Sequence, residues 1–190
     1  MTGREKFKKI KILVNFFSGI FKIFGHRVNL LFLNFFRNTN GNIGVLLRYI
    51  FIKNLAKKVG DNVSIQPGVY LFNLQNIEFG NNVSIHPMCY LEGAGGIIIG
   101  DDVSIAHAST LISANHTWED QSKPIKYNPE KLGAITLEND VWVGCGVRIL
   151  ADVIIRERSI IAAGAVVNKS FENKCLIGGV PAKVIKKINE

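Results

Sequence analysis

The sequence predicts an all-β solenoid, wound as a coil with three short flat sides and preceded by a basic helical segment. Three observations support this fold class: an aliphatic residue at every sixth position, a phrase that returns every 20 residues, and a separation of charge along the chain. With 190 residues, 47% of them hydrophobic and 20% charged, the chain suits one globular domain with a sizeable core.

The six-residue period begins at Val59 and continues to Val167 with one interruption. A helix repeats its faces every 3.6 residues, so this period favours a coil whose three sides each send one aliphatic residue to the axis. The phrases GDNVSI, GNNVSI and GDDVSI place Gly60, Gly80 and Gly100 as turn formers at corners, where Gly, Asn and Asp tolerate positive φ values. The inward series is Val59, Ile65, Leu71, Phe79, Ile85, Leu91, Ile99, Ile105, Leu111, Leu137, Val143, Ile149, Ile155, Ile161 and Val167.

Residues 1–58 form a basic, Phe-rich segment. They contain 12 Lys and Arg, one acid and nine of the 12 phenylalanines, whereas residues 59–190 contain 11 Lys and Arg and 14 acids. Charges interrupt the apolar runs too often for a membrane span, and no small-residue cleavage site follows them. The apolar spacing predicts two or three amphipathic helices. Such helices pack on the domain or on a neighbouring subunit, or they dock on an anionic membrane face; both interpretations use the same apolar stripe.

The three cysteines, Cys89, Cys145 and Cys175, lack the spacing of a disulfide framework or a zinc site. This favours a reducing, cytosolic setting and no metal. No nucleic-acid partner is expected, because the basic character belongs to the helical segment alone.

Three phrases beside the repeat carry a resemblance to a known family: SANHTWED (113–120), LENDVWVGCGVRIL (137–150) and IAAGAVVNKSFENKCLIGGVPAKVIKKI (161–188). With them, the chain from residue 59 resembles the hexapeptide-repeat acyltransferases, closest to the galactoside and maltose acetyltransferases and the surface-polysaccharide O-acetyltransferases. The resemblance implies a left-handed parallel β-helix of about five coils with a short C-terminal helix, a homotrimer, and acetyl-CoA as co-substrate. It divides the chain into a helical segment, 1–58, and an acyltransferase domain, 59–190.

The repeat halts at His116 and resumes after an irregular loop, residues 117–136. A long loop that leaves a rigid solenoid commonly builds a binding surface. The resemblance implies that this loop reaches toward a neighbouring subunit and that His116 is the general base. The imidazole would take the proton of an acceptor hydroxyl that attacks the acetyl-CoA carbonyl directly, while a backbone N–H from the adjoining coil stabilises the oxyanion.

Five residues are candidates for binding the acceptor or orienting His116. Trp118 offers a ring for stacking on a sugar, and Glu92, Asn115 and Glu119 offer polar groups for its hydroxyls or for the imidazole. His86 stands about where the galactoside enzymes carry an asparagine that contacts the acceptor. It is equally well explained as a corner residue beside Pro87.

The remaining candidates concern the cofactor. Small residues at Gly144, Cys145 and Ala163 would let a pantetheine arm approach the coil, and Trp142 would flank the thioester end. Cys145 is interpreted as a small packed side chain rather than a nucleophile. The positions that match the nucleotide end of CoA in the family are Asn168, Lys169, Lys183 and Lys186.

The favoured function is acetyl-CoA-dependent O-acetyl transfer to a sugar hydroxyl of a surface polysaccharide or its precursor, in the cytoplasm. Peripheral contact at the inner membrane face belongs to the membrane interpretation of residues 1–58, which stays open beside the packing interpretation. Two alternatives use the same fold: N-acetyl transfer to an amino sugar, and a non-catalytic trimeric scaffold. A zinc carbonic anhydrase needs three metal-binding histidines, and the spacing of His86, His107 and His116 does not match that pattern.

Overall fold

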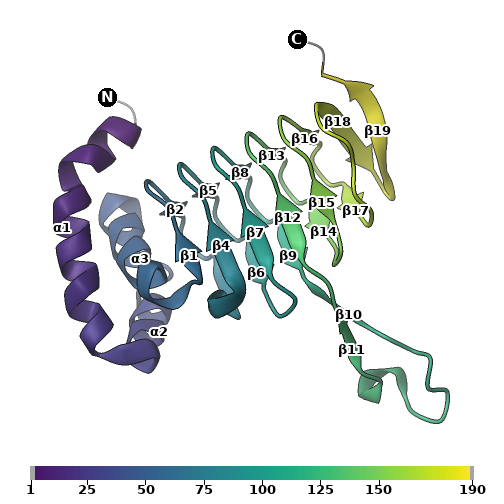
Figure 1. The fold of residues 1–190 in the computed structure, drawn as a ribbon, viewed down its shortest axis with the longest axis horizontal. Coiled ribbons are helices and arrows are strands. Elements are labelled where there is room, and N and C mark those ends of the chain that lie inside the picture. Colours follow the sequence, from purple (N-terminus) through teal and green to yellow (C-terminus); the bar gives the residue numbers. More distant parts are fainter. Residues whose placement is uncertain (1–2, 189–190) are drawn as a thin grey trace.

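A computed structural model describes residues 3–188, and it shows three helices followed by a parallel β-solenoid of about six turns (Figure 1). The helices are α1 (Gly3–Ile23), α2 (Gly25–Phe35) and α3 (Gly41–Leu55). They gather at the N-terminal end of the solenoid, with α1 outermost (Figure 1). The fold class and the N-terminal helices are therefore as predicted, and the turns slightly exceed the five expected.

Each turn contributes one short strand to each of three faces. The first face consists of β1 (Lys58–Val59), β4 (Ile77–Phe79), β7 (Ile97–Ile99), β12 (Ile135–Leu137) and β15 (Ile154–Ile155). The second face consists of β2 (Ser64–Ile65), β5 (Ser84–Ile85), β8 (Ser104–Ile105), β13 (Trp142–Val143), β16 (Ile160–Ile161), β18 (Cys175–Gly179) and β19 (Ala182–Lys187). The third face consists of β3 (Tyr70–Phe72), β6 (Tyr90–Glu92), β9 (Thr110–Ile112), β14 (Arg148–Ile149) and β17 (Val166–Val167).

The core is the axis of this coil, and the inward series predicted from the sequence fills it. Thirteen of the fifteen residues in that series are at most 1% exposed. The other two, Val59 and Leu71 of the first turn, are partly buried. Parallel pairing in register, such as Ile65 with Ile85 and Ile85 with Ile105, stacks each inward side chain on its equivalent in the next turn.

The corners are partly as predicted. Asn62, Asn82 and Asp102 take left-handed φ values of 58°, 58° and 59° in successive turns. The glycines that precede them serve another purpose. A Cβ on Gly60 would lie 2.5 Å from the backbone of Gly80. The glycine is therefore needed so that two turns of the solenoid can stack closely, and not for a positive φ value.

The predicted C-terminal helix is wrong. Residues Ala182–Lys187 form β19, which pairs antiparallel with β18 at the edge of the second face. The sheet would otherwise end at β18 with unpaired N–H and C=O groups, and β19 satisfies them. The helix was expected from the family resemblance alone, and the open sheet edge beside this segment decides its conformation.

The helices close the N-terminal end of the core. Arg48 of α3 is almost fully buried, and its Nε donates to the carbonyl oxygen of Ile65 at 2.8 Å. Its Nη1 donates to the carbonyl oxygens of Phe36 and Thr39, each at 2.8 Å. Burial lowers the pKa of the Arg48 guanidinium. One side chain thus ties α3 to the first turn and to the connection from α2.

Neighbouring residues on β7 test the inward stack. Ile99 points to the axis at 1% exposure, whereas Ile98 points outward at 43%. We expect Ile99→Ala to lower the free energy of unfolding by about 2–5 kcal/mol, because it leaves a cavity between two turns. Ile98→Ala is the matched control and should cost less than about 1 kcal/mol. Chemical denaturation measures both; equal costs would contradict the assignment of inward and outward sides.

Candidate functional site

A two-stranded arm leaves the solenoid at the corner between the third and first faces, which is called the third corner here. Its strands are β10 (Ala114–His116) and β11 (Glu130–Leu132), paired antiparallel, and Figure 1 shows them projecting from the side of the coil. The excursion therefore begins before His116, and part of the expected irregular loop 117–136 is strand. His116 stands on the arm rather than at the end of a coil.

Ser113 anchors the base of the arm. Its hydroxyl donates to the carbonyl oxygen of Glu92 at 2.7 Å and accepts from the N–H of Gly95 at 2.9 Å. Where the chain comes back to the coil, the N–H of Gly133 donates a hydrogen bond to the carbonyl oxygen of Ser113, also at 2.9 Å. A Cβ on Gly95 would lie 2.3 Å from that same oxygen, so the glycine leaves room for both chain crossings.

His116 faces Glu130 across the arm. The two residues are register partners, and Nε2 of His116 lies 3.8 Å from Oε1 of Glu130. Both side chains are more than half exposed, at 55% and 53%. Glu130 was not among the sequence candidates, because only the pairing of β10 with β11 brings it opposite the histidine. No signal in the sequence specifies that register.

The tip of the arm is held by Asn128, which is buried. Its Oδ1 accepts from the N–H of Asp120 at 3.0 Å, and its Nδ2 donates to the carbonyl oxygen of Asp120 at 3.2 Å. Lys123 and Ser122 hold the pKa of the Asp120 carboxyl below its usual range through hydrogen bonds. The ordered tip includes a short 3₁₀ helix, η2 (Ile125–Tyr127).

The acceptor candidates on the arm are exposed. Trp118 and Asn115 face solvent in the single chain. Glu119 accepts a hydrogen bond from the N–H of Trp118 at 3.1 Å, and backbone N–H groups hold the pKa of its carboxyl below its usual range. Although Glu119 and His116 are near in sequence, they have different partners in the described structure: Glu119 accepts from Trp118, and His116 faces Glu130.

The two candidates on the coil lie elsewhere. Oε1 of Glu92 accepts from Asn73 Nδ2 at 2.7 Å and from the N–H of Ala94 at 2.8 Å, so this oxygen holds a corner and does not orient His116. His86 is exposed and follows β5, at the corner between the second and third faces, here the second corner. Within one chain His86 and His116 therefore stand at different corners.

Several cofactor candidates share the outer side of the second face. Cross-strand partners run in a row from Trp142 to Ile160, then Leu176, then Lys186. Lys183 pairs with Gly178, and an irregularity between Leu176 and Ile177 shifts the register so that both lysines keep the outward side. An apolar strip from an exposed tryptophan thus ends at two cations, roughly 14 Å away across three strand spacings.

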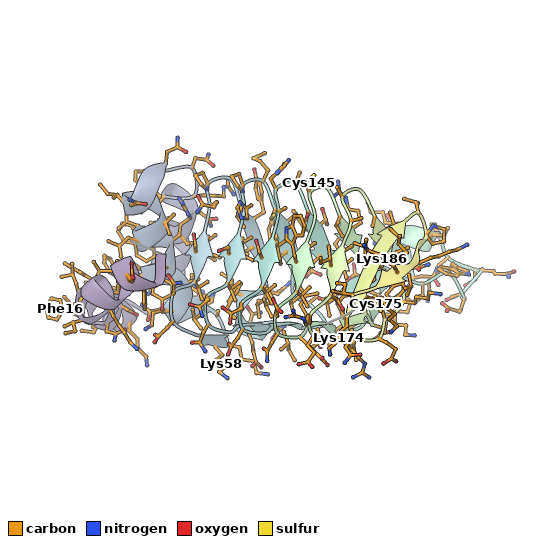
Figure 2. The ribbon with its side chains drawn as sticks, turned by 90° about the horizontal axis from the view of Figure 1, so that it is seen from above. Phe16, Lys58, Cys145, Lys174, Cys175 and Lys186 are labelled. Atoms are coloured by element: carbon orange, nitrogen blue, oxygen red, sulfur yellow. The ribbon has the colours of Figure 1, made fainter. Side chains whose placement is uncertain are left out.

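The second corner holds Cys145 and Ala163, on adjacent turns beside this row (Figure 2 labels Cys145 and Lys186). Equivalent positions in the first two turns are Pro67 and Pro87, which have no N–H. Among the described residues, neither the N–H of Cys145 nor the N–H of Ala163 donates a hydrogen bond to a backbone oxygen. These two donors are available to a ligand.

Gly144 was expected to let a pantetheine arm approach the coil, but the structure gives this glycine another role. It is buried, and a Cβ there would lie 2.7 Å from the backbone nitrogen of Ala163. Its N–H donates to Ile161 at 2.8 Å, and its carbonyl oxygen accepts from Ser109 Oγ at 2.9 Å. Position 144 therefore requires glycine because a side chain there would collide with the backbone of the next turn.

Asn168 and Lys169 lie at the third corner, directly after β17. That is the corner from which the arm leaves, two strands further along the third face. Lys169 Nζ lies 5.8 Å from the centre of the Phe171 ring. The cofactor candidates of one chain are therefore divided between two corners. Among the described residues, no three His, Cys, Asp or Glu side chains gather as a metal site.

Comparison with known proteins places this geometry in a family. Residues 134–169 match the family model described as bacterial transferase hexapeptide (six repeats). The galactoside O-acetyltransferase of Escherichia coli K12 is 32% identical over 148 residues, which cover 75% of this chain and 70% of that protein.

Two solved structures share the fold. One is a hexapeptide-repeat acetyltransferase from Vibrio cholerae complexed with acetyl coenzyme A, at 26% identity and a TM-score of 0.77, covering 88% of this chain and 90% of that one. The other is a galactoside acetyltransferase in complex with coenzyme A, at 30% identity and a TM-score of 0.77, covering 86% and 80%. From the repeat, the corners and these likenesses, we conclude that the chain belongs to the hexapeptide-repeat acetyltransferase family, whose left-handed parallel β-helix it shares.

Proposed function

We propose that this protein transfers the acetyl group of acetyl-CoA directly to a sugar hydroxyl of a surface polysaccharide or its precursor, with His116 as the general base. The observation that carries the proposal is the placement of His116. The strand that carries His116, β10, belongs to the arm that projects from the coil (Figure 1). Its imidazole is more than half exposed, so it can meet a substrate proton.

The proposed reaction is a single displacement. An imidazole nitrogen of His116 accepts the proton of the acceptor hydroxyl as its oxygen bonds to the thioester carbonyl carbon. The C–S bond then breaks, and the CoA thiolate leaves with the proton that the imidazolium returns. The N–H groups of Cys145 and Ala163 suit the developing oxyanion, because no described residue accepts a hydrogen bond from them.

The active enzyme is proposed to be a homotrimer with sites shared between protomers. In one chain His116 leaves from the third corner, whereas Trp142, Cys145 and Ala163 lie on the second face and the second corner. A neighbouring protomer set beside the arm would bring the two halves together. The exposed Trp118, with Ile125 and Tyr127, gives the arm an apolar surface for that neighbour or for a sugar ring.

The proposed setting is the cytoplasm. The three cysteines are free, and two of them, Cys89 and Cys175, are buried in the core. None of the described helices is both long and apolar enough to cross a bilayer. The part of the proposal that concerns a membrane depends on a separate set of residues, those of the N-terminal helices.

Replacing the base tests the reaction. We expect His116→Ala to lower kcat by roughly 10²–10⁴-fold with little change in the melting temperature, since the side chain is exposed. The control is His26→Ala, in the helical segment, which should leave kcat unchanged. CoA release against a panel of sugars and amino sugars is the measurement. Transfer only to amines would favour N-acetylation, and undiminished turnover in His116→Ala would favour another base or a scaffold.

The lysines of β19 test the cofactor path. We expect the double variant Lys183→Ala, Lys186→Ala to raise the KM for acetyl-CoA roughly tenfold, because both cations point outward at the end of the strip. With S-acetylpantetheine, which lacks the phosphates, the variant and the parent should behave alike. Lys187→Ala is the matched control, because Lys187 pairs with the inward-pointing Cys175 and points the other way. An equal loss with both donors would contradict this path.

Subunit mixing tests the shared site. His116→Ala removes the base, and Ala163→Trp fills the second corner, so each homotrimer should be inactive. Co-expression of the two should restore about a quarter of the parental activity, the fraction of interfaces that combine an intact arm with an intact face. No recovery in verified mixed trimers would mean that each site lies within one protomer.

A further inference from the structure

Helix α1 has two apolar sides, and among the described residues only one of them packs against other parts of the chain. Val14 is fully buried and Ser18 nearly so, on the side that faces α3. On the other side Ile12, Phe16 and Ile23 are 84%, 63% and 83% exposed. Figure 2 shows Phe16 at the very end of the molecule, pointing away from the solenoid. A group of large apolar side chains exposed together on one side of a helix marks an interaction site.

A polar network fixes which side of α1 faces inward. Ser18 Oγ donates to Asn54 Oδ1 at 3.0 Å, and Asn54 Nδ2 donates to Asn29 Oδ1 at 3.0 Å. Asn29 in turn donates to the carbonyl oxygens of Phe21 and Gly25, at 2.8 and 2.7 Å. The three helices are thereby locked to one another by partly buried hydrogen bonds. The outer side of α1 is therefore not an alternative packing face for this chain.

The outer apolar residues of α1, with Phe24 directly after it, are here called the end surface. They include aliphatic and aromatic side chains that are all at least one-third exposed. The end surface consists of Ile12, Leu13, Phe16, Phe17, Ile20, Ile23 and Phe24. Exposed cations lie next to it, since Lys22 precedes Ile23 and Arg27 follows Phe24 by three residues.

The charge around the end surface selects its partner. Residues 1–58 carry 12 Lys and Arg against one acid, Glu5. A second copy of this chain would bring the same cations together, which opposes association through this surface. An anionic lipid headgroup layer supplies the opposite charge, and its acyl region accepts phenylalanine and isoleucine side chains.

We propose that the end surface docks the enzyme on anionic phospholipid bilayers, with α1 lying in the plane of the interface. The solenoid then stands away from the membrane, because α1 crosses its N-terminal end (Figure 1). The arm leaves from the third turn, roughly 30 Å from α1 once the packing of α1 on α3, of α3 on the first turn, and two turns of the coil are counted. That height suits an acceptor whose lipid anchor is in the bilayer and whose sugars extend from it.

Vesicle flotation tests the docking surface. The parent chain should float with phosphatidylcholine vesicles that contain phosphatidylglycerol, less with phosphatidylcholine alone, and less again at high salt. Ile12→Ser with Phe16→Ser and Ile23→Ser should weaken binding to the anionic vesicles at least about 100-fold. The control is Val180→Ser with Ile185→Ser, two exposed apolar residues at the opposite end, which should float like the parent.

A second variant reads the charge separately. Lys22→Glu with Arg27→Glu keeps every apolar residue and should weaken binding to the anionic vesicles at least tenfold. Acetyl transfer to a soluble acceptor should stay unchanged in both surface variants, so failure of the proposed chemistry and failure of docking are distinguishable.

Three results would overturn the proposal. The first is a parent chain that does not float with anionic vesicles. The second is a serine variant that floats as well as the parent. The third is light scattering in which the serine variant forms a smaller assembly while the parent shows no lipid binding; the end surface would then be an interface between copies of the chain.

Discussion

The stacking of one aliphatic side chain on its equivalent in the next turn is the interaction on which the rest of this structure depends. Ile65, Ile85 and Ile105 lie directly above one another on the second face, and the other two faces repeat the arrangement. Because the stack uses one residue in six, it leaves the outward positions and the corners free to vary. The outward position on the second face changes from Ser104 to Trp142 between neighbouring turns without any change in the core.

Both ends of such a stack need a cover, since an open solenoid end exposes apolar side chains and sheet edges. Helix α3 covers the first turn and is fastened there by Arg48, and the β18–β19 hairpin extends the last turns of the second face. This capping accounts for the buried side of the helices. Capping does not explain the exposed apolar residues on the outer side of α1. Those residues are the basis for the proposed docking on a lipid bilayer.

The division of the candidate site follows from the same architecture. A triangular coil separates its corners, so groups that leave from different corners of one chain start from different sides of the coil. His116 departs at the third corner, and the free N–H groups of Cys145 and Ala163 lie at the second. In the proposed mechanism, the arm carries His116 away from its own coil toward a cofactor that lies along another protomer. The ordered tip around Asn128 gives the arm a defined shape for that contact.

The sequence by itself determined the features that depend on fixed separations along the chain. The inward series, the left-handed Asn and Asp corners, the amphipathic helices and the departure of the chain near His116 are of this kind, because a repeat encodes each contact locally. Only the tertiary structure decided the features that depend on register between non-repeating segments. Glu130 opposite His116, Lys183 and Lys186 on one side of β19, and the strand in place of a C-terminal helix each depend on which backbone lies alongside. The stacking role of Gly60 likewise depends on the turn beside it. The sequence around each of these residues is compatible with more than one conformation, and the neighbouring sheet edge or turn selects among them.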